Sequence, residues 1–428
     1  MTDYTKQLVE QRRELHQWPE EGWTEFWTTN YIVNKLRSWG YEVLLGTKII
    51  NPEQVFGRNE KLVQEGIKNA LARGVSQSFI DETEGYTGCV ALLDTGKEGP
   101  TTAFRFDIDC VCVNETDNPE HKPNKEGFRS QHTGFMHACG HDAHMASLIG
   151  AAIVLKKYED LLPGKVLLIF QPSEENAKGA KLICEHGYLD NVDEIFGLHV
   201  FTDIDCGKLS IESGARMAAS DKFIIHINGK AGHAGTPHQC IDASLVCAAI
   251  LMNLQSIISR EIDPLDNAVV TVGHIESGST HNIISSKAFI EGTVRTFSVS
   301  TAKHIKASIE RISYATALSY GATVNIDYES SAHPAVINDI NVVNTALNGA
   351  KKIFTDNTFI KTPPIMLGED FSIYQKKIPG AFAFVGSGND EIGCDHPNHS
   401  EKFNIDEKSV IIGTQLYLAY ALEALSKT

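Results

Sequence analysis

Residues 146–200 read ASLIGAAIVLKKYEDLLPGKVLLIFQPSEENAKGAKLICEHGYLDNVDEIFGLHV, and this stretch decides the fold. Two helical runs, ASLIGAAIVLKKYEDLL and AKGAKLICEHG, alternate with two strand-like runs, KVLLIFQP and EIFGLHV. Two more strand-like runs, GCVALLDT and TTAFRFDID, precede them. Alternation of this kind is typical of an α/β fold with a mainly parallel sheet and helices on both faces.

The middle of the chain has a different order of predicted strands and helices. The strand-like run KFIIHINGK is followed by a helical run, two strand-like runs, a second helical run and the strand-like run ATVNIDYES. This β-α-β-β-α-β order is typical of a ferredoxin-like sandwich. We therefore expect a first domain at 1–216 and 333–428, interrupted by an inserted α+β domain at 217–332. Residues 46–84 are expected to form a polar helical insertion in the first domain, after a helix or broken helix pair at 5–39.

Composition narrows the class of protein. A length of 428 residues suggests two domains, and 42% hydrophobic with 21% charged residues is ordinary for a globular chain. The net charge of −16 repels nucleic acid and anionic membranes. No apolar run looks long enough to span a bilayer, and no signal peptide is recognisable. We expect a cytoplasmic protein with nine reduced cysteines and no nucleic-acid or membrane partner.

Side chains with ligand chemistry gather at predicted strand ends and helix starts, where open parallel sheets bind ligands. The stretch MHACGHDAHMA at 136–146 places Cys139 and His141 just before a helix that Asp142 is expected to cap. The residues alone leave three roles open for Cys139: a nucleophile with His137 or His141 as base, a metal ligand, or an ordinary buried thiol. The other clusters are Asp107 with Asp109, Glu174 with Glu175, His199, and His396 with His399.

Glu174 and Glu175 directly follow a predicted buried strand. Adjacent carboxylates repel each other unless a cation holds one of them or the two have separate tasks. One could bind a metal while the other acts as general base, but a solvated turn or a helix start explains the pair equally well. The N, S and O donors in these clusters would suit zinc, manganese, cobalt or nickel rather than calcium.

The inserted domain carries three further candidates. GKAGHAGTPH at 229–238 surrounds His233 with glycines, so the imidazole could reach another surface, although a simple turn histidine is the commoner case. Asn282 and Arg295 are polar residues in apolar surroundings that could bind a substrate carbonyl or carboxylate. An arginine within a strand is also commonly part of a solvated sheet face.

Read in order, MHACGHDAHMA, FQPSEENAKGA, GLHV, GKAGHAGTPH and HSEKFNIDE resemble the M20 metallopeptidases, in the amidohydrolase branch of aminoacylases, hippurate hydrolases and auxin-conjugate hydrolases. The resemblance covers nearly the whole chain. The 46–84 insertion, followed by EGYTGCVALLDTGKEGP, is similar more narrowly to the A subunit of p-aminobenzoyl-glutamate hydrolases. CVCVNET and NIIS depart from the usual family pattern, which affects the expected fit of the substrate more than the chemistry.

The resemblance implies a site with two divalent ions, zinc or manganese, or else cobalt or nickel. The implied metal ligands are Cys139, His141, Glu175, His199 and His399. Glu174 is implied as the base that activates metal-bound water. His233, in a lid or dimerisation domain, is implied to polarise the scissile carbonyl with Asn282 beside it. Asp107 and Asp109 are implied to orient site residues.

These expectations combine into a metal-dependent amidohydrolase that cleaves the amide bond of an N-acyl or N-aroyl amino acid. The narrower expectation is p-aminobenzoyl-glutamate, and a homodimer formed through the inserted domain is expected. Two alternatives stay open. The chain could be one component of a two-subunit hydrolase and be inactive alone, or it could be a cysteine hydrolase that uses Cys139.

Overall fold

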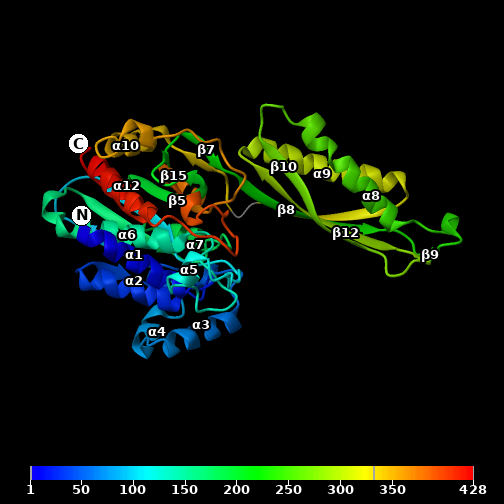
Figure 1. Ribbon diagram of the computed structural model, residues 1–428. Coiled ribbons are helices and arrows are strands. Elements are labelled where there is room, and N and C mark those ends of the chain that lie inside the picture. Colours follow the sequence, from blue (N-terminus) through cyan, green and yellow to red (C-terminus); the bar gives the residue numbers. More distant parts are fainter. Residues whose placement is uncertain (1, 331–332, 428) are drawn as a thin grey trace. The chain divides into compact units, whose positions relative to one another are not determined.

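The computed structural model of the chain describes residues 2–330 and 333–427. The chain divides into two compact units, coloured along the sequence in Figure 1. The first unit comprises Met1–Arg216, Ile337–Pro363 and Asp370–Thr428, and the second comprises Met217–Val336 and Pro364–Glu369. The expected boundary between 332 and 333 touches residues 331 and 332, which lie outside the described residues. The short segment Pro364–Glu369, expected in the first domain, groups with the second unit.

The first unit is built on a seven-stranded sheet in the order β1-β2-β4-β3-β5-β15-β6. Its centre, β4-β3-β5-β15, is parallel as predicted. The predicted strand β2 runs antiparallel to β4, and the short strands β1 and β6, which were not predicted, are antiparallel to their neighbours. The strands are β1 (Glu42–Leu44), β2 (Cys89–Asp94), β3 (Thr101–Asp107), β4 (Lys165–Gln171), β5 (Glu194–Asp205), β6 (Leu209–Ser210) and β15 (Gly380–Gly388).

Helices cover both faces of this sheet. Successive side chains of a strand point to opposite faces, so neighbouring residues of one strand contact different helices. Phe196 of β5 stacks on Tyr420 at 4.4 Å between ring centroids, while the next residue, Gly197, faces Phe371 on the other side. Tyr420 belongs to α12 (Lys408–Leu425), which packs beside α6 (His141–Lys157). Phe371 begins α11 (Phe371–Gln375), which packs against α7 (Gly179–Glu185).

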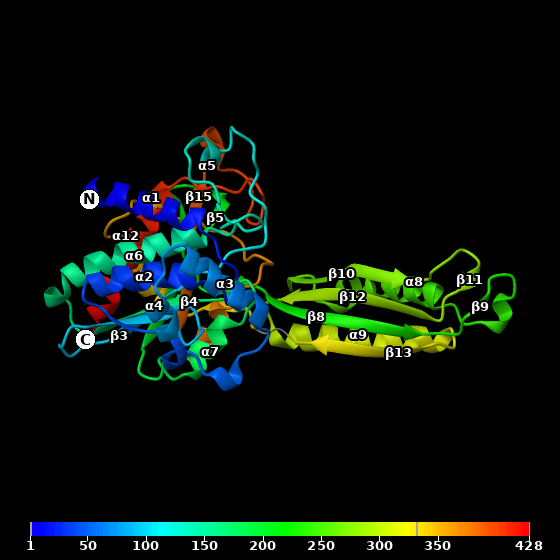
Figure 2. The ribbon, with the colours of Figure 1, turned by 90° about the horizontal axis from the view of Figure 1, so that it is seen from below.

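The remaining helices of the first unit pack around this core. α1 (Thr2–Gln17) and α2 (Phe26–Ser38) pack against α6 (Figure 2). α10 (Ile340–Ala350) packs against α12 (Figure 1). The 46–84 stretch contains two 3-10 turns (Gly46–Lys48 and Pro52–Gln54) followed by α3 (Glu60–Ala72) and α4 (Gln77–Thr83). Both helices have side-chain caps: the Asn59 side chain accepts the Lys61 amide, and the Ser76 hydroxyl accepts the Phe79 amide. The other short helices are α5 (Lys122–Lys125), Glu159–Leu161, Asp356–Thr358 and Asp390–Ile392.

The second unit has the β-α-β-β-α-β order expected from the sequence. Its elements are β8 (Ala219–Asn228), α8 (Ala243–Leu254), β10 (Ala268–Ser277), β12 (Lys287–Thr296), α9 (Val299–Ser319) and β13 (Thr323–Glu329). The sheet is antiparallel in the order β10-β12-β8-β13, and its core joins strand and helix side chains such as Phe223, Ile250 and Ile309. The short strands β9 (Gly232–His233) and β11 (Ile283–Ile284) also pair in this unit. The pair β7 (Gly214–Met217) and β14 (Val336–Asn338) stands where the chain passes from one unit to the other, with most of its residues in the first. A short helix, Pro237–Gln239, follows β9.

One helical stretch among the described residues, Ala243–Glu261, is long and apolar enough to cross a membrane by length and composition. It joins α8 to the π-helical turn Ile257–Glu261 and corrects the expectation that no stretch would qualify. Val246, Ile250 and Ile257 of this stretch are buried in the core of the second unit. One face of the stretch is therefore already used for packing against its own sheet.

Two local predictions were wrong. Asp142 does not cap α6, because the helix begins at His141, two residues before the start that a cap at Asp142 would give, and its N-cap is Gly140 with φ +88°. Asp142 instead binds side chains of α1, as described below. β5 does not end at His199 but continues to Asp205. Its pairing with β3 ends at Gly197, and β15 supports the continuation on the other side.

Candidate metal centre

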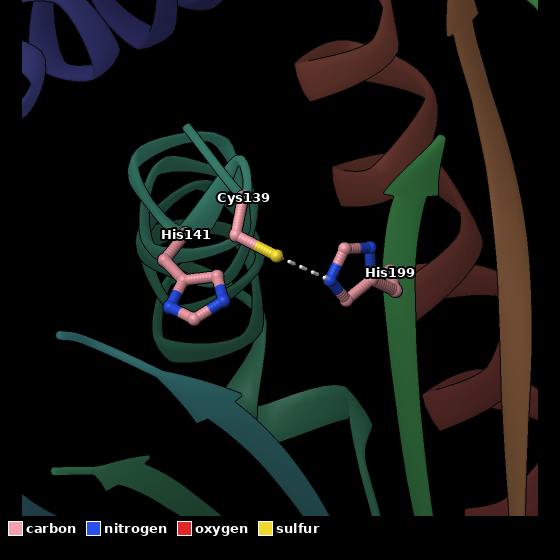
Figure 3. A group of neighbouring side chains, drawn as sticks. All are labelled: Cys139, His141 and His199. Carbon is pink, nitrogen blue, oxygen red and sulfur yellow. Dashed lines mark hydrogen bonds between the residues drawn. The ribbon is translucent and has the colours of Figure 1, made fainter. Parts of the chain in front are cut away.

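The five predicted metal ligands converge within the first unit from separate elements. Cys139 precedes α6, His141 begins it, Glu175 follows β4, His199 lies within β5, and His399 lies in the loop before α12. The Sγ atom of Cys139 points toward His199 and lies 3.4 Å from its Nε2 atom, with His141 alongside (Figure 3). The sequence therefore identified residues that the fold brings together across 260 positions of chain, from residue 139 to residue 399.

The separations between these atoms suit metal coordination. Glu175 Oε1 lies 3.7 Å from His141 Nε2 and 3.4 Å from His399 Nε2. Ligands about 2.0–2.3 Å from one ion in tetrahedral geometry stand roughly 3.3–3.8 Å apart. Cys139, His141 and His199 have ligand atoms within 4.8 Å of one another, and so do Cys139, Glu175 and His399. Two overlapping ligand groups fit a centre with more than one ion.

The hydrogen bonds of this cluster leave its lone pairs free for a metal. His141 Nδ1 donates to the backbone oxygen of Asp109 at 3.0 Å, which leaves the lone pair on Nε2. His199 Nδ1 donates to the backbone oxygen of Val200 at 2.8 Å, with the same consequence. His141 Nε2 and Glu175 Oε1 are buried and have no hydrogen-bond partner among the described residues. Such an unsatisfied group costs about 1–3 kcal/mol, a cost that a bound cation removes.

The charges of the cluster also favour a cation. Burial raises the pKa of the Cys139 thiol, and the charge of Glu175 raises it further. A cysteine nucleophile needs a lowered pKa, so this environment fits a thiolate formed by a metal better than a reactive thiol. The nearby Cys139 sulfur, and then the Glu175 carboxylate 3.4 Å away, raise the pKa of His399 to about 10. Burial, and then His144, lowers the pKa of His199, which keeps that imidazole neutral.

Asp107 and His144 are buried beside the candidate ligands and hydrogen-bond to each other and to β5. His144 Nδ1 donates to Asp107 Oδ1 at 2.7 Å, and its Nε2 accepts the Val200 amide at 3.0 Å. Both nitrogens of His144 are therefore engaged, so it orients the strand beside His199 rather than binding a metal. Arg105 Nη1 in turn lies 3.0 Å from Asp107 Oδ2, and all three side chains are buried.

Asp109 follows β3 and contacts the loop after β4, which carries Glu174. Asp109 Oδ2 accepts the Glu175 amide at 3.0 Å, so Asp109 contacts both His141 and the glutamate loop. Ligand atoms of His141, Glu174 and Glu175 lie within 4.8 Å of one another, and the Asp370 amide donates to Glu174 Oε1 at 3.5 Å. Glu174 thus lies next to the candidate metal ligands and accepts a hydrogen bond of its own, a position that would suit a general base.

The backbone around the cluster is strained. Ser173, Ala177 and His399 have φ values of +54°, +53° and +68°, a region that non-glycine residues rarely adopt. Each such residue costs on the order of 1–3 kcal/mol and persists only where the surroundings hold it. Strain of this kind concentrates at functional sites, and here it flanks Glu174 and accompanies His399.

The three remaining predicted residues lie in the second unit. His233 is exposed in β9, and the Ala234 amide donates to the Asn282 backbone oxygen at 3.1 Å, so His233 and Asn282 are neighbours. Arg295 is half-buried in β12 between Ser220 and Val269, and burial lowers its pKa. The part that these three residues take in the site remains a prediction.

Sequence reasoning missed several residues behind the site. Arg105 binds Gln171 and Asp370 as well as Asp107, and an arginine inside the otherwise apolar run TTAFRFDID was a signal that could have found it. Glu25 accepts a hydrogen bond from the Ser173 amide at 2.8 Å. Nothing in the sequence around Glu25 indicates this contact, because the two residues are 148 positions apart.

A model of peptidase family M20/M25/M40 matches residues 103–423, a range that contains all five candidate ligands. The chain belongs to this family. The M20 chain is 34% identical to a Haemophilus influenzae homolog of the A subunit of p-aminobenzoyl-glutamate hydrolase, over 98% of this chain and 99% of that protein. It is 36% identical to the N-acetyl-L-cysteine deacetylase of Bacillus subtilis, over 95% of this chain and 85% of that protein.

Among solved structures, the M20 chain resembles a dinuclear metal-binding peptidase of family M20 from Bacillus subtilis. The TM-score is 0.79, with 29% sequence identity and complete coverage of both chains. The predicted family membership is therefore confirmed, and with it the prediction of a hydrolase that acts on amide bonds. The donor set found in the first unit agrees with a metal-dependent member of the family.

Proposed function

We propose that this M20 chain is a metal-dependent amidohydrolase that releases an acyl or aroyl group from an N-acyl amino acid. The narrower proposal is an N-aroyl glutamate, with p-aminobenzoyl-glutamate as the first substrate to test. One observation carries the proposal: five donors converge, two of them with buried atoms that lack a partner among the described residues, and Glu174 lies beside them. The relatives named above support the class of substrate, since both act on small acylated compounds by name.

The residues of the chain supply what amide hydrolysis requires. An amide is a poor electrophile, so the reaction needs a deprotonated water, a polarised carbonyl and a protonated leaving nitrogen. Two divalent ions held by Cys139, His141, Glu175, His199 and His399 would act as Lewis acids on the carbonyl and lower the pKa of water. The Glu174 carboxylate would take the proton of the attacking water and deliver it to the leaving nitrogen. Its position beside His141 and Glu175 places the base next to the ligands that would hold the ions.

The second unit is proposed to complete the site. His233 is exposed at the end of its strand and would donate a hydrogen bond to the carbonyl oxygen as negative charge develops, with Asn282 beside it. Losing such a donor costs on the order of 3 kcal/mol in comparable sites. Arg295 would pair with the carboxylate of the amino acid. In this proposal, the second unit would act as a lid within a homodimer.

The exposed edge strand of the second unit supports the homodimer. β10 lies at one end of the four-stranded sheet, and its residues from Gly273 to Ser277 are exposed. An unpaired strand edge is a ready surface for pairing with a second chain. Substrate-dependent activity that falls on dilution below the dimer dissociation constant would support a shared site.

A second candidate has one observation in its favour. The name of the Haemophilus influenzae relative refers to one subunit of a hydrolase, so this chain could require a different partner chain for activity. The two candidates differ in what the purified chain does alone. In the first, the chain with metal is sufficient for turnover, whereas in the second it binds metal and stays inactive.

One experiment separates them. The purified chain is stripped with a chelator, reloaded with zinc or manganese, and tested on p-aminobenzoyl-glutamate, hippurate and N-acetyl amino acids. We expect metal-dependent release of the free amino acid from at least one of these substrates, and no release from the stripped protein. Metal binding without turnover on any of them favours the partner-dependent chain.

A further inference from the structure

Two buried glutamates lie five residues apart at the start of α2 and make different contacts. Glu20 accepts hydrogen bonds from the Trp27 and Thr28 amides, at 3.1 and 2.8 Å, and so caps the first turn of α2 from a distance. Glu25 occupies the N-cap position itself, yet its side chain makes no capping hydrogen bond. The helix is therefore capped by Glu20, and the Glu25 carboxylate is available for another contact.

The Glu25 carboxylate binds the loop that carries Glu174. Its Oε1 accepts the Ser173 amide at 2.8 Å, and its Oε2 accepts the Thr87 hydroxyl at 2.6 Å. Glu25 is fully buried, so these bonds are shielded from water. Ser173 is one of the residues with positive φ, and it directly precedes Glu174. The bond from Glu25 therefore acts on the strained residue next to the proposed base.

A second buried carboxylate holds the other side of Glu174. Asp109 accepts the amide of Glu175, one residue beyond Glu174, at 3.0 Å. Two buried carboxylates thus hold the amides on either side of the proposed base. Gly22, in the same segment as Glu25, lies so close to the loop that an added Cβ would come within 2.6 Å of Ser173 Oγ and 2.8 Å of Asn176 Nδ2. The segment around Glu25 is therefore packed tightly on the loop.

We propose that Glu25 is a positioning residue that holds Glu174 in place through the Ser173 amide. This inference rests on the proposed role of Glu174 as general base. Without the carboxylate, Ser173 loses the partner that stabilises its left-handed conformation and relaxes toward negative φ. The carboxylate of Glu174 then moves relative to the metal ligands. A displacement of about 1 Å from a change remote from the chemistry can cost on the order of 100-fold in rate.

Three variants test the proposal in the metal-loaded full chain. Glu25→Ala removes the contact, Glu25→Gln keeps an acceptor for the Ser173 amide, and Glu20→Ala is the matched control in the same segment. Three quantities are measured: kcat and KM on the best substrate, metal content, and deuterium uptake of peptides that cover residues 172–179. The uptake reports the loop directly and does not depend on activity.

For Glu25→Ala we expect a fall in kcat on the order of 100-fold, KM within about threefold, unchanged metal content and faster uptake in 172–179. Glu25→Gln should restore uptake and most of kcat. Glu20→Ala should lower the melting temperature but leave kcat and loop uptake unchanged. If residues 172–179 take up deuterium in the Glu25→Ala variant at the same rate as in the unmodified chain, the inference is overturned, whatever the activity. An equal loss of kcat in Glu25→Ala and Glu20→Ala overturns it as well. If loop uptake rises while no protein turns over any amide, the positioning role stands and the proposed function fails.

Discussion

Two clusters of histidines and carboxylates lie on either side of the start of α6, and neighbouring residues belong to different clusters. His141 belongs to the metal-ligand cluster (Cys139, His141, Glu175, His199 and His399), whereas Asp142 belongs to a buried ionic cluster (Arg12, His16, Glu115, Asp142 and Glu407). In the ionic cluster, His16 Nδ1 lies 2.8 Å from Asp142 and its Nε2 lies 3.1 Å from Glu115. In the ligand cluster, His141 Nε2 is buried without a hydrogen-bond partner among the described residues.

The difference shows what identifies a metal site in a chain like this one. Both clusters are dense in residue types that bind metals, and both are largely buried. In the ligand cluster, His141 Nε2 and Glu175 Oε1 are buried without a hydrogen-bond partner among the described residues. The ionic cluster instead contains Arg12, which supplies the positive charge from within the protein. Buried acceptor atoms that converge without a hydrogen-bond partner, rather than the density of histidines and carboxylates, therefore mark the candidate metal centre.

The largest expected effect comes from His141→Ala. Removing this ligand should release at least one ion per chain and reduce turnover to background, because a lost ligand costs more than the 10- to 100-fold typical of losing an outer partner. Metal content by mass spectrometry and turnover with excess zinc or manganese measure both effects. Full metal content in the variant would contradict the assignment of His141.

Asp142→Ala sharpens the comparison, because it changes the adjacent residue. It leaves the buried Arg12 guanidinium without its carboxylate 2.8 Å away. Breaking a buried ion pair in this way costs about 3–5 kcal/mol in the free energy of unfolding. Urea unfolding should show this loss, while the folded variant keeps its full metal content. If Asp142→Ala lost as much metal as His141→Ala, the ionic cluster would also be required for metal binding, and the two clusters would not be separate.

The contribution of the ionic cluster to the free energy of unfolding should depend on pH because of Glu407. Burial opposes its charge, but the hydrogen bond from Arg13 and the charges of Arg12 and Lys122 outweigh burial and lower the pKa of Glu407 to about 2. Because the folded pKa lies below the unfolded value, this stability is present above about pH 4.5 and is lost as the pH falls through about 2. Glu407→Gln should destabilise the protein by about 3 kcal/mol at pH 7, and less at pH 3.

Urea midpoints of both proteins at pH 7 and pH 3 test this dependence. Glu126→Gln is the matched control, since Glu126 also binds Arg13, at 2.6 Å, but is 41% exposed. An exposed pair contributes about 0–1 kcal/mol, so this variant should change little at either pH. A destabilisation by Glu407→Gln that is the same at both pH values would show that packing, not charge, is the cause.

The smallest expected effect comes from His144→Ala, which alters the support of the ligand cluster but no ligand. The variant leaves Asp107 and the Val200 amide without their common partner. Metal affinity should fall about 10- to 100-fold, which is typical for an outer partner. Competition with a chelator measures it. Unchanged affinity would mean that β5 holds His199 in place without help from His144.

The sequence predicted the parts of the fold that depend on local periodicity. The alternation around residues 146–200 predicted the parallel centre of the sheet, and the β-α-β-β-α-β order predicted the elements of the second unit. The edge strands β1 and β6 were missed because they are only three and two residues long. A strand of that length has too few residues to show a period of two.

Residue types and spacing predicted which side chains would meet at the site, but not how each is supported. Cys139, Glu175 and His399 come together as the motifs implied. The expected cap by Asp142 was wrong because Arg12, on a separate helix, binds that carboxylate, and no local pattern indicates such a partner. The bond from Glu25 to Ser173 was missed for the same reason, since it joins segments 148 residues apart.

The central claim is that the ligand cluster holds metal while Glu174 performs the proton transfer. The most direct measurement is metal content and kcat of Glu174→Gln in the same preparation. We predict full metal content and a fall in kcat on the order of 1,000-fold, within the range for removal of a general base. Turnover within about tenfold of the unmodified chain, with full metal content, would contradict the account, because another group would then be moving the proton.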